Sequence, residues 1–404
     1  MKKTIPLLCA LLLCVSLFTV ATPSAQAAPV ITAQAAVVLD FETGEILFER
    51  NMHVSRPPAS MTKIMTAYIV FEEIAAGNLT LDTYIPISHH ASHFARDAWP
   101  GHLILTAGHY YSVETLLRLI MLPSHNGACI ALAEYISGSE EAFVVRMNQA
   151  AERLGMDAVY ENSHGLWGNS KSAYATAILL RDFITNHPDI LRISSMRSFT
   201  FKGATVNNTN RILSETHIDG FKTGTTAAAG PCLASTAYRD GQRVIVVTMA
   251  SSNNDNRFLD SQRLLNFGLE EAARRAAARD AEREAEEARR VHVTINGAPV
   301  IFDVQPTLIN ARTMVPIRAV VEALGAEVGW DHETQTVTVT TAAGDVISCT
   351  IGSYILYIND EPVEMDIAPV VIGGRTLLPI RFVVEAMGAT VEWDGGTRTV
   401  VITT

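Results

Sequence analysis

A serine and a lysine stand three residues apart at the start of a strongly apolar segment. Ser60 and Lys63 follow two prolines, and residues 64–71 are apolar nearly throughout. Because prolines fix the entry to a helix and positions i and i+3 share a face, we expect both side chains on the first turn of a buried helix. A serine hydroxyl needs a neighbouring base to attack a carbonyl. A lysine whose pKa is lowered by burial or by a second cation can be that base.

Two further clusters supply matching groups. Ser124 and Asn126 stand on a tight connection between two apolar helical patterns, so both can point into one cleft. The strand pattern at Lys222, Thr223 and Gly224 would present an ammonium, a hydroxyl and an unobstructed backbone to a groove. Alone, S-x-x-K is a weak signal, because surface helices often carry serine and lysine at this spacing. Together, S-x-x-K, S-x-N and K-T-G in this order are the motif set of penicillin-interacting serine enzymes.

Over about residues 35–265 the chain resembles the low-molecular-weight penicillin-binding proteins of the D-alanyl-D-alanine carboxypeptidase family, serine peptidase family S11. The stretches Asn162–Leu166 and Asp219–Gly224 add to the three motifs. The resemblance implies an α+β, β-lactamase/DD-peptidase-like domain, in which an antiparallel sheet is flanked by helices. Two departures stand out: Gly127 occupies the place where aspartate commonly follows S-x-N, and residues 169–174 lack the usual histidine-tyrosine pair.

The resemblance also implies a role for each motif residue. Ser60 would be the nucleophile that attacks the penultimate D-alanine of a peptidoglycan stem peptide, Lys63 its base, and Ser124 the relay of a proton to the leaving D-alanine. The implied substrate-binding residues are Asn126, Lys222, Thr223, Gly224 and Thr225. Backbone N–H groups of Ser60 and Thr225 would form an oxyanion hole. The resemblance implies no metal or organic cofactor, and β-lactams as covalent inhibitors.

Two other functions use part of this pattern. A β-lactamase shares S-x-x-K and K-T-G, but a class A enzyme needs a glutamate that activates the deacylating water, and the surroundings of Glu161 do not fit that loop. A non-catalytic wall-binding protein with a vestigial penicillin-binding half is the third possibility. All the motif residues are intact, which argues against such decay: Ser60, Lys63, Ser124, Asn126 and Lys222. We therefore expect a serine-type D-Ala-D-Ala carboxypeptidase that trims stem pentapeptides.

The N-terminus predicts export. Lys2 and Lys3 precede the apolar run 5–20, and Ala25-Gln26-Ala27 then offers small residues for cleavage, so we expect a signal peptide at 1–27. No later apolar run is long enough to span a bilayer, which predicts a mature chain without a transmembrane segment. We expect a secreted, extracytoplasmic protein associated with the cell wall. The formal net charge of −11 argues against a nucleic-acid partner.

A change of composition near residue 269 predicts the domain organisation. We expect the catalytic domain at 28–268 and a charged helical linker at 269–291, where glutamates and arginines recur four residues apart without an apolar stripe. Beyond it, residues 292–404 hold two α+β repeats with a period of 63, such as Val293–Val300 and Leu356–Val363.

The repeats resemble the stalk-like N-terminal domain of copper amine oxidases. The resemblance rests on R-T-[ML]-[VL]-P-I-R and a later W-D in each repeat. It does not imply copper chemistry, because this region has too few histidines for a copper site. The repeated arginines could bind a cell-wall polymer or pin helix to strand, and we favour the second. We expect Trp330 and Trp393 to be packing residues.

Overall fold

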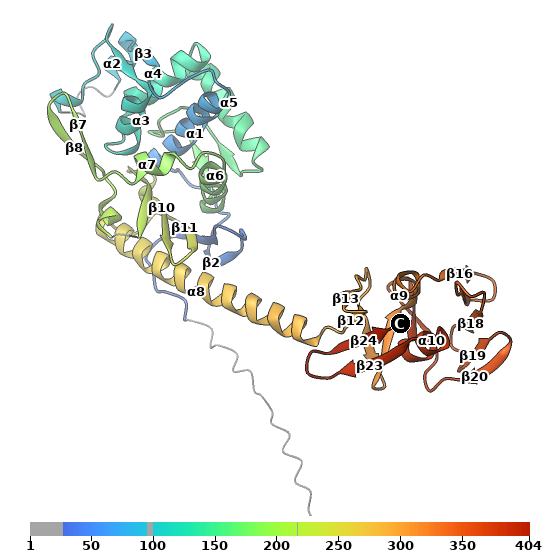
Figure 1. The fold of residues 1–404 in the computed structure, drawn as a ribbon. Helices are drawn as coiled ribbons and strands as arrows, with labels where there is room; N and C mark the ends of the chain where they lie inside the picture. The colour runs from blue at the N-terminus through green and yellow to red at the C-terminus, as the bar shows by residue number, and fades with distance from the viewer. Residues whose placement is uncertain (1–26, 95–99, 216) are drawn as a thin grey trace, which may run out of the picture. The chain divides into compact units, whose positions relative to one another are not determined.

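The computed structural model describes residues 27–94, 100–215 and 217–404. The predicted signal peptide therefore lies outside the described residues, except for its last position. The chain forms two compact units, which divide between Ala276 and Ala277 (Figure 1). Each unit has its own hydrophobic core.

The first unit is built on a five-stranded antiparallel sheet of order β2-β1-β11-β10-β9. Its strands are β1 (Ala35–Asp40), β2 (Ile46–Arg50), β9 (Ile218–Thr226), β10 (Gly230–Arg239) and β11 (Gln242–Met249). Alternate residues of β1 enter different cores: Val37 and Leu39 join the large helical core, whereas Val38 joins the core on the opposite face. Because both faces are buried, the central strands are apolar without interruption.

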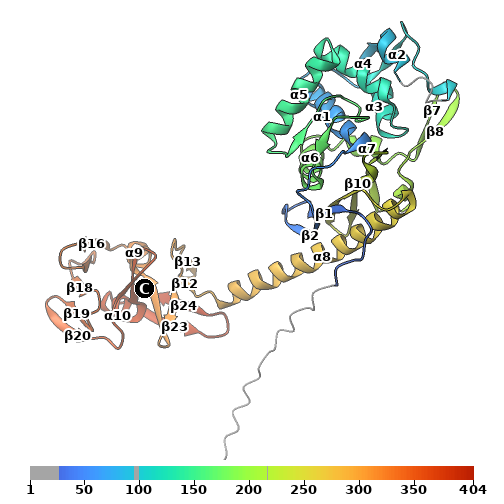
Figure 2. The same ribbon diagram turned by 180° about the vertical axis from the view of Figure 1, so that it is seen from behind.

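Helices cover both faces of this sheet (Figures 1 and 2). They are α1 (Lys63–Ala75), α2 (His89–His93), α3 (Val113–Met121), α4 (Asn126–Ser137), α5 (Glu140–Arg153), α6 (Ala173–Asn186), α7 (Ile190–Ser194) and α8 (Asn254–Arg289). Short elements complete the unit: η1 (Ala59–Thr62), η3 (Gly101–Leu103), η4 (Arg211–Ser214), β3 (Tyr84–Pro86), β4 (Tyr110–Ser112), β5 (Ala158–Val159), β6 (Ser170–Lys171), β7 (Ser198–Phe201) and β8 (Ala204–Asn207). Helix α6 lies against β1 and β11. The predicted antiparallel sheet flanked by helices is confirmed.

Helix α8 begins at Asn254, well before the start expected near residue 269. Its first turns carry an apolar stripe, and Leu264, Leu265 and Leu269 are buried against the sheet. The charged part follows in the same helix, where Glu271 accepts from Arg275 at 2.8 Å, the i,i+4 pairing that the sequence predicted. The composition change at 269 therefore marks the end of the buried stripe and not the start of the helix.

The C-terminal unit interlocks its two repeats. The first repeat contains β12 (His292–Ile295), β13 (Ala298–Pro299), β14 (Thr307–Ile309), β15 (Arg312–Pro316), α9 (Ile317–Ala323), β16 (Glu327–Asp331) and β17 (Thr336–Thr340). After β18 (Val346–Thr350), the second contains β19 (Ile355–Ile358), β20 (Glu361–Glu364), β21 (Val370–Ile372), β22 (Arg375–Pro379), α10 (Ile380–Ala386), β23 (Thr390–Asp394) and β24 (Thr399–Thr403). The sheets β13-β12-β24-β23 and β14-β15-β22-β21 each combine both repeats. A third sheet has the order β16-β17-β18-β19-β20, so that β18 joins strands of the first repeat to strands of the second. Neither repeat completes its sheets alone.

Two expectations about this unit are wrong. Arg312 and Arg375 do not pin helix to strand: Arg375 pairs with Asp303 of the other repeat at 2.6 Å, and Arg312 pairs reciprocally with Asp366. Trp330 is 42% exposed and is not a packing residue, and the same holds for Trp393. The recurrence of tryptophan in both repeats suggested a buried position. A repeat preserves its surface positions as well as its buried ones, so recurrence alone does not indicate burial.

Candidate active site

The turn before α1 presents the predicted nucleophile. The 3-10 turn η1 runs from Ala59 to Thr62, and α1 starts directly at Lys63. This geometry brings the Lys63 Nζ to 3.0 Å from the Ser60 Oγ, so the ammonium can donate to the hydroxyl. The following residues to Phe71 are all buried, as the apolar run predicted. The serine is thus fixed at the edge of a rigid central helix.

Lys63 is fully buried, and its hydrogen-bond acceptors are neutral. Besides Ser60, Nζ donates to the Asn126 Oδ1 at 2.7 Å and to the backbone carbonyl of His164. Burial without a counter-charge disfavours the ammonium form and lowers the pKa of Lys63 to about 8. An appreciable share of neutral amine is therefore present near neutral pH, which is what a base for the serine requires.

The connection between α3 and α4 carries the second motif. Ser124 has a positive φ of 75°, and its enclosed Oγ has no hydrogen-bond partner among the residues that the structure describes. His125 caps α4, because its Nδ1 accepts from the Ala128 N–H at 3.1 Å, and burial lowers the pKa of its imidazole to about 4. Asn126 then reaches Lys63. The middle residue is thus a neutral cap, and Asn126 contacts the base candidate Lys63.

The glycine that departs from the family pattern has a steric cause. A Cβ added to Gly127 would lie 2.3 Å from the backbone carbonyl oxygen of Ala91 in α2. An aspartate, or any other side chain, does not fit here unless α2 moves away from α4. The departure therefore reflects a close approach of two helices beside the site.

The edge strand β9 delivers the third motif. Lys222 is fully buried. Its pKa is lowered well below the usual value, mainly by burial and to a smaller extent by the positive charge of nearby Lys63. Thr223 shares a hydrogen bond of 2.6 Å with Thr209. A Cβ on Gly224 would lie 2.7 Å from the carbonyl oxygen of Pro58, so only glycine lets β9 pack against η1. The K-T-G motif thus combines a buried amine, a hydroxyl and a close contact.

Three supporting residues lie outside the three motifs. Arg257 at the start of α8 donates to the Thr225 Oγ1 at 2.8 Å, which holds the end of the K-T-G strand. Lys171, fully buried, donates to the carbonyl of Met61 at 3.1 Å, and burial lowers its pKa to about 7. Neither stands in a motif, so only the fold reveals them. His164 contributes its carbonyl, and its buried imidazole is neutral, with a pKa lowered to about 3.

Hydrogen bonds join Ser60, Lys63 and Asn126, and the packing of β9 against η1 brings Gly224 to the same turn. Thr225 follows Gly224 in β9, and its hydroxyl accepts from Arg257 of α8. In the part of the chain that the structure describes, no three histidine, cysteine or acidic side chains are grouped to hold a metal ion. The arrangement offers an activated hydroxyl, an enclosed second hydroxyl and buried amines, a set suited to acyl transfer.

Comparison with known proteins agrees with this chemistry. Residues 22–253 match the family described as D-alanyl-D-alanine carboxypeptidase, which is more than half of the chain. The chain belongs to this family. Residues 294–402 match the copper amine oxidase N-terminal domain, as the repeats predicted.

Individual members of the D-alanyl-D-alanine carboxypeptidase family align with the first unit. The carboxypeptidase DacD of Salmonella typhimurium is 35% identical over 259 residues, covering 61% of this chain and 65% of that protein. The chain thus spans slightly less than two thirds of this relative. Penicillin-binding protein 6B of Escherichia coli is 36% identical, with a TM-score of 0.57 over 61% of this chain and 80% of that one.

Penicillin-Binding Protein D2 of Listeria monocytogenes, solved in an ampicillin-bound form, is 29% identical. Its TM-score is 0.54, over 60% of this chain and 99% of that one. In the described ranges, no helix combines the length and the apolar character that crossing a membrane requires.

Proposed function

We propose that this protein is an exported serine-type D-Ala-D-Ala carboxypeptidase that acts through an acyl-enzyme on Ser60. The observation that carries the proposal is the fully buried Lys63 amine, 3.0 Å from the Ser60 hydroxyl and surrounded by neutral acceptors. Membership of the family, and the carboxypeptidase names of its relatives, support the substrate class.

The reaction follows from these groups. The Ser60 hydroxyl gives its proton to the neutral Lys63 amine while Oγ bonds to the carbonyl carbon of the penultimate D-alanine. The bond to the terminal D-alanine breaks, and its nitrogen takes the proton from Lys63 through the Ser124 hydroxyl. Water then adds to the ester and gives a proton to Lys63, which returns it to Ser60 as the shortened peptide leaves. The substrate lies along β9, where Lys222, Thr223, Gly224 and Thr225 hold it, and Asn126 binds it from α4.

The test follows D-alanine release from a soluble pentapeptide ending in D-Ala-D-Ala, together with labelling by a fluorescent penicillin. We expect the full chain to do both and Ser60→Ala to do neither. Ser55→Ala serves as the matched control, because Ser55 is an exposed neighbour whose hydroxyl shares a hydrogen bond with the side chain of Ser170. Labelling without release would contradict the carboxypeptidase activity. Rapid hydrolysis of the penicillin would identify a β-lactamase instead.

We also propose that residues 292–404 retain the enzyme at the cell wall. Support comes from the export signal predicted at 1–27, and from an arrangement that leaves polar and aromatic side chains of the repeats exposed. Deleting 292–404 should release the enzyme from wall fractions. Unchanged wall association of the truncated chain would contradict this role.

A further inference from the structure

Both repeats of the C-terminal unit expose a tryptophan at the same position. Trp330 lies near the end of β16 and Trp393 near the end of β23, each 42% exposed and each followed by an aspartate. Tryptophan is enriched at interaction surfaces, and an exposed apolar patch rimmed by polar groups marks a binding site. Because neither indole belongs to a core, folding alone does not account for their recurrence.

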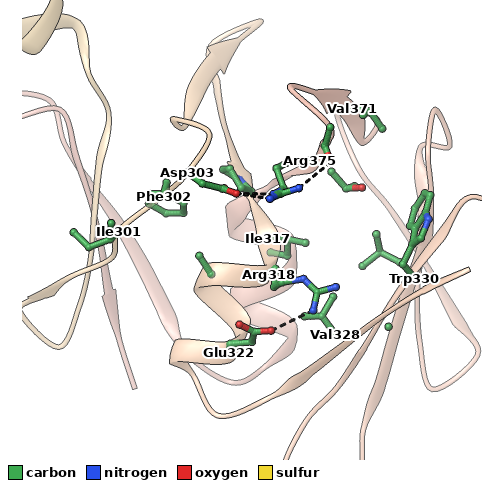
Figure 3. Close-up of a pocket in the computed structure, with 16 residues that line it drawn as sticks. Ile301, Phe302, Asp303, Ile317, Arg318, Glu322, Val328, Trp330, Val371 and Arg375 are labelled. Carbon is green, nitrogen blue, oxygen red and sulfur yellow. Dashed lines mark hydrogen bonds and ion pairs between the residues drawn. The ribbon is translucent and has the colours of Figure 1, made fainter.

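Trp330 lines a groove of about 800 Å³, which is within the usual range for small-ligand sites. Figure 3 shows Trp330 on one side, Phe302 on the other, and Arg318 of α9 with Arg375 of β22 between them. The groove therefore combines an aromatic face with two guanidinium groups. Because Arg375 comes from the second repeat, the groove exists only when the repeats interlock.

The second repeat forms an equivalent groove of about 440 Å³. With the offset of 63 residues, Trp393 corresponds to Trp330 and Arg381 corresponds to Arg318. Arg312 of the first repeat occupies the position that Arg375 has in the first groove. The smaller volume agrees with Phe382, which replaces Ala319 of the first groove. The unit thus carries two related grooves, each with one indole and two guanidinium groups.

The charges in these grooves are paired. Arg375 contacts Asp303 at 2.6 Å, and Arg318 contacts Glu322 at 3.3 Å. In the second groove, Arg312 pairs with Asp366 and Arg381 contacts its helix neighbour Glu385 at 3.8 Å. A polyanion would have to displace these carboxylates, whereas a neutral ligand can use the remaining donors and acceptors of both partners. The grooves therefore favour a ligand rich in hydroxyl and amide groups.

We propose that the two grooves are glycan-binding sites for a neutral polymer of N-acetylated amino sugars. The flat apolar face of a pyranose ring would stack on each indole, while hydroxyl and acetamide groups would bond to the arginine–carboxylate pairs. Two equivalent sites suit a ligand that repeats itself, since holding two segments at once strengthens binding without new kinds of contact. This inference rests on the proposed wall retention and gives it a site and a ligand class.

The experiment measures co-sedimentation of the full chain with purified wall sacculi. A saturating β-lactam blocks the first unit, and the sacculi are used before and after removal of phosphate-linked polymers. We expect the full chain to bind both preparations. Trp330→Ala or Trp393→Ala alone should weaken binding about tenfold, and the double variant about a hundredfold. Tyr357→Ala, an equally exposed aromatic outside both grooves, should bind like the native chain.

A soluble oligomer of N-acetylglucosamine provides the second readout, because its stacking should change tryptophan fluorescence in the native chain and less in the double variant. Loss of binding after removal of the phosphate-linked polymers would overturn the neutral ligand. If the double variant binds sacculi like the native chain, the grooves are not the binding sites, although residues 292–404 would still retain the enzyme at the wall. D-alanine release from a soluble pentapeptide should be unchanged in every variant, which separates this inference from the proposed activity. Because the two units have separate cores, thermal melts of each variant report whether the C-terminal unit is folded.

Discussion

The two units use cationic side chains in opposite ways. In the first unit, Lys63 and Lys222 are fully buried, and the acceptors around Lys63 are neutral. In the C-terminal unit, Arg318 and Arg375 are more than half exposed and bonded to carboxylates. Burial without a counter-charge destabilises the charged form and produces a base, whereas pairing at the surface keeps the charge and produces a recognition surface. Burial and charge pairing thus determine whether a cationic side chain serves as a base or as part of a binding surface.

The largest expected effect concerns the base. Lys63→Arg keeps a cation but cannot release a proton near neutral pH, and Lys63→Met removes the amine, so both should slow acylation of Ser60 about a thousandfold. The rate of labelling by a fluorescent penicillin measures this, with thermal melts to confirm folding. Arg318→Gln in the second unit should label at the native rate. Native labelling by Lys63→Arg would show that the buried cation does not act as a base.

Packing density provides the next contrast. Alanine normally stabilises a helix relative to glycine, but a Cβ at Gly127 would lie 2.3 Å from the Ala91 carbonyl oxygen, so Gly127→Ala should lower the free energy of unfolding by about 2 kcal/mol. At Gly329, beside the first groove, the nearest atom is 3.8 Å away, and Gly329→Ala should be neutral or slightly stabilising. Denaturant unfolding of both variants tests this. If Gly127→Ala and Gly329→Ala change the free energy of unfolding equally, the two positions do not differ in packing as described.

The sequence predicts the residues of the active site better than it predicts their support. The spacing of S-x-x-K places Ser60 and Lys63 on one turn, and their side chains do meet. The contact of Asn126 with Lys63 joins residues far apart in the chain, and only the order of the three motifs, through the resemblance, predicted it. Arg257 and Lys171 reach the site from distant segments, and such long-range contacts leave no local pattern.

The same distinction holds for the fold. Periodicity reveals the repeats, because each one preserves its own strands and helix. Periodicity does not reveal that Arg312 and Arg375 form ion pairs between the repeats. Those pairs depend on how the strands of one repeat pair with strands of the other, which is a tertiary contact. The expectation that Trp330 and Trp393 are packing residues is wrong, because recurrence shows only that a position is equivalent in the two repeats and does not show that it is buried.

The pH dependence gives a smaller effect. Since burial lowers the pKa of Lys63 to about 8, its neutral fraction falls about tenfold for each pH unit below that value. The acylation rate should therefore rise with pH up to about 8 and then level off. Sacculus binding should stay constant over the same range, because arginine remains charged throughout. An acylation rate independent of pH would contradict the assignment of Lys63 as the base.

The smallest effect distinguishes a partly buried arginine–aspartate pair from an exposed one. Arg243 and Asp219 of the first unit form two hydrogen bonds of 2.9 and 2.7 Å with little exposure, so a double-mutant cycle should give a coupling of about 1 kcal/mol. Arg375 and Asp303 are both more than half exposed, and solvent screening should leave no measurable coupling in the free energy of unfolding. The groove pair should instead matter for sacculus binding, where Arg375→Gln should weaken affinity. A strong coupling in unfolding would mean that this pair holds the repeats together, and its arginine would then be a structural contact and not a ligand contact.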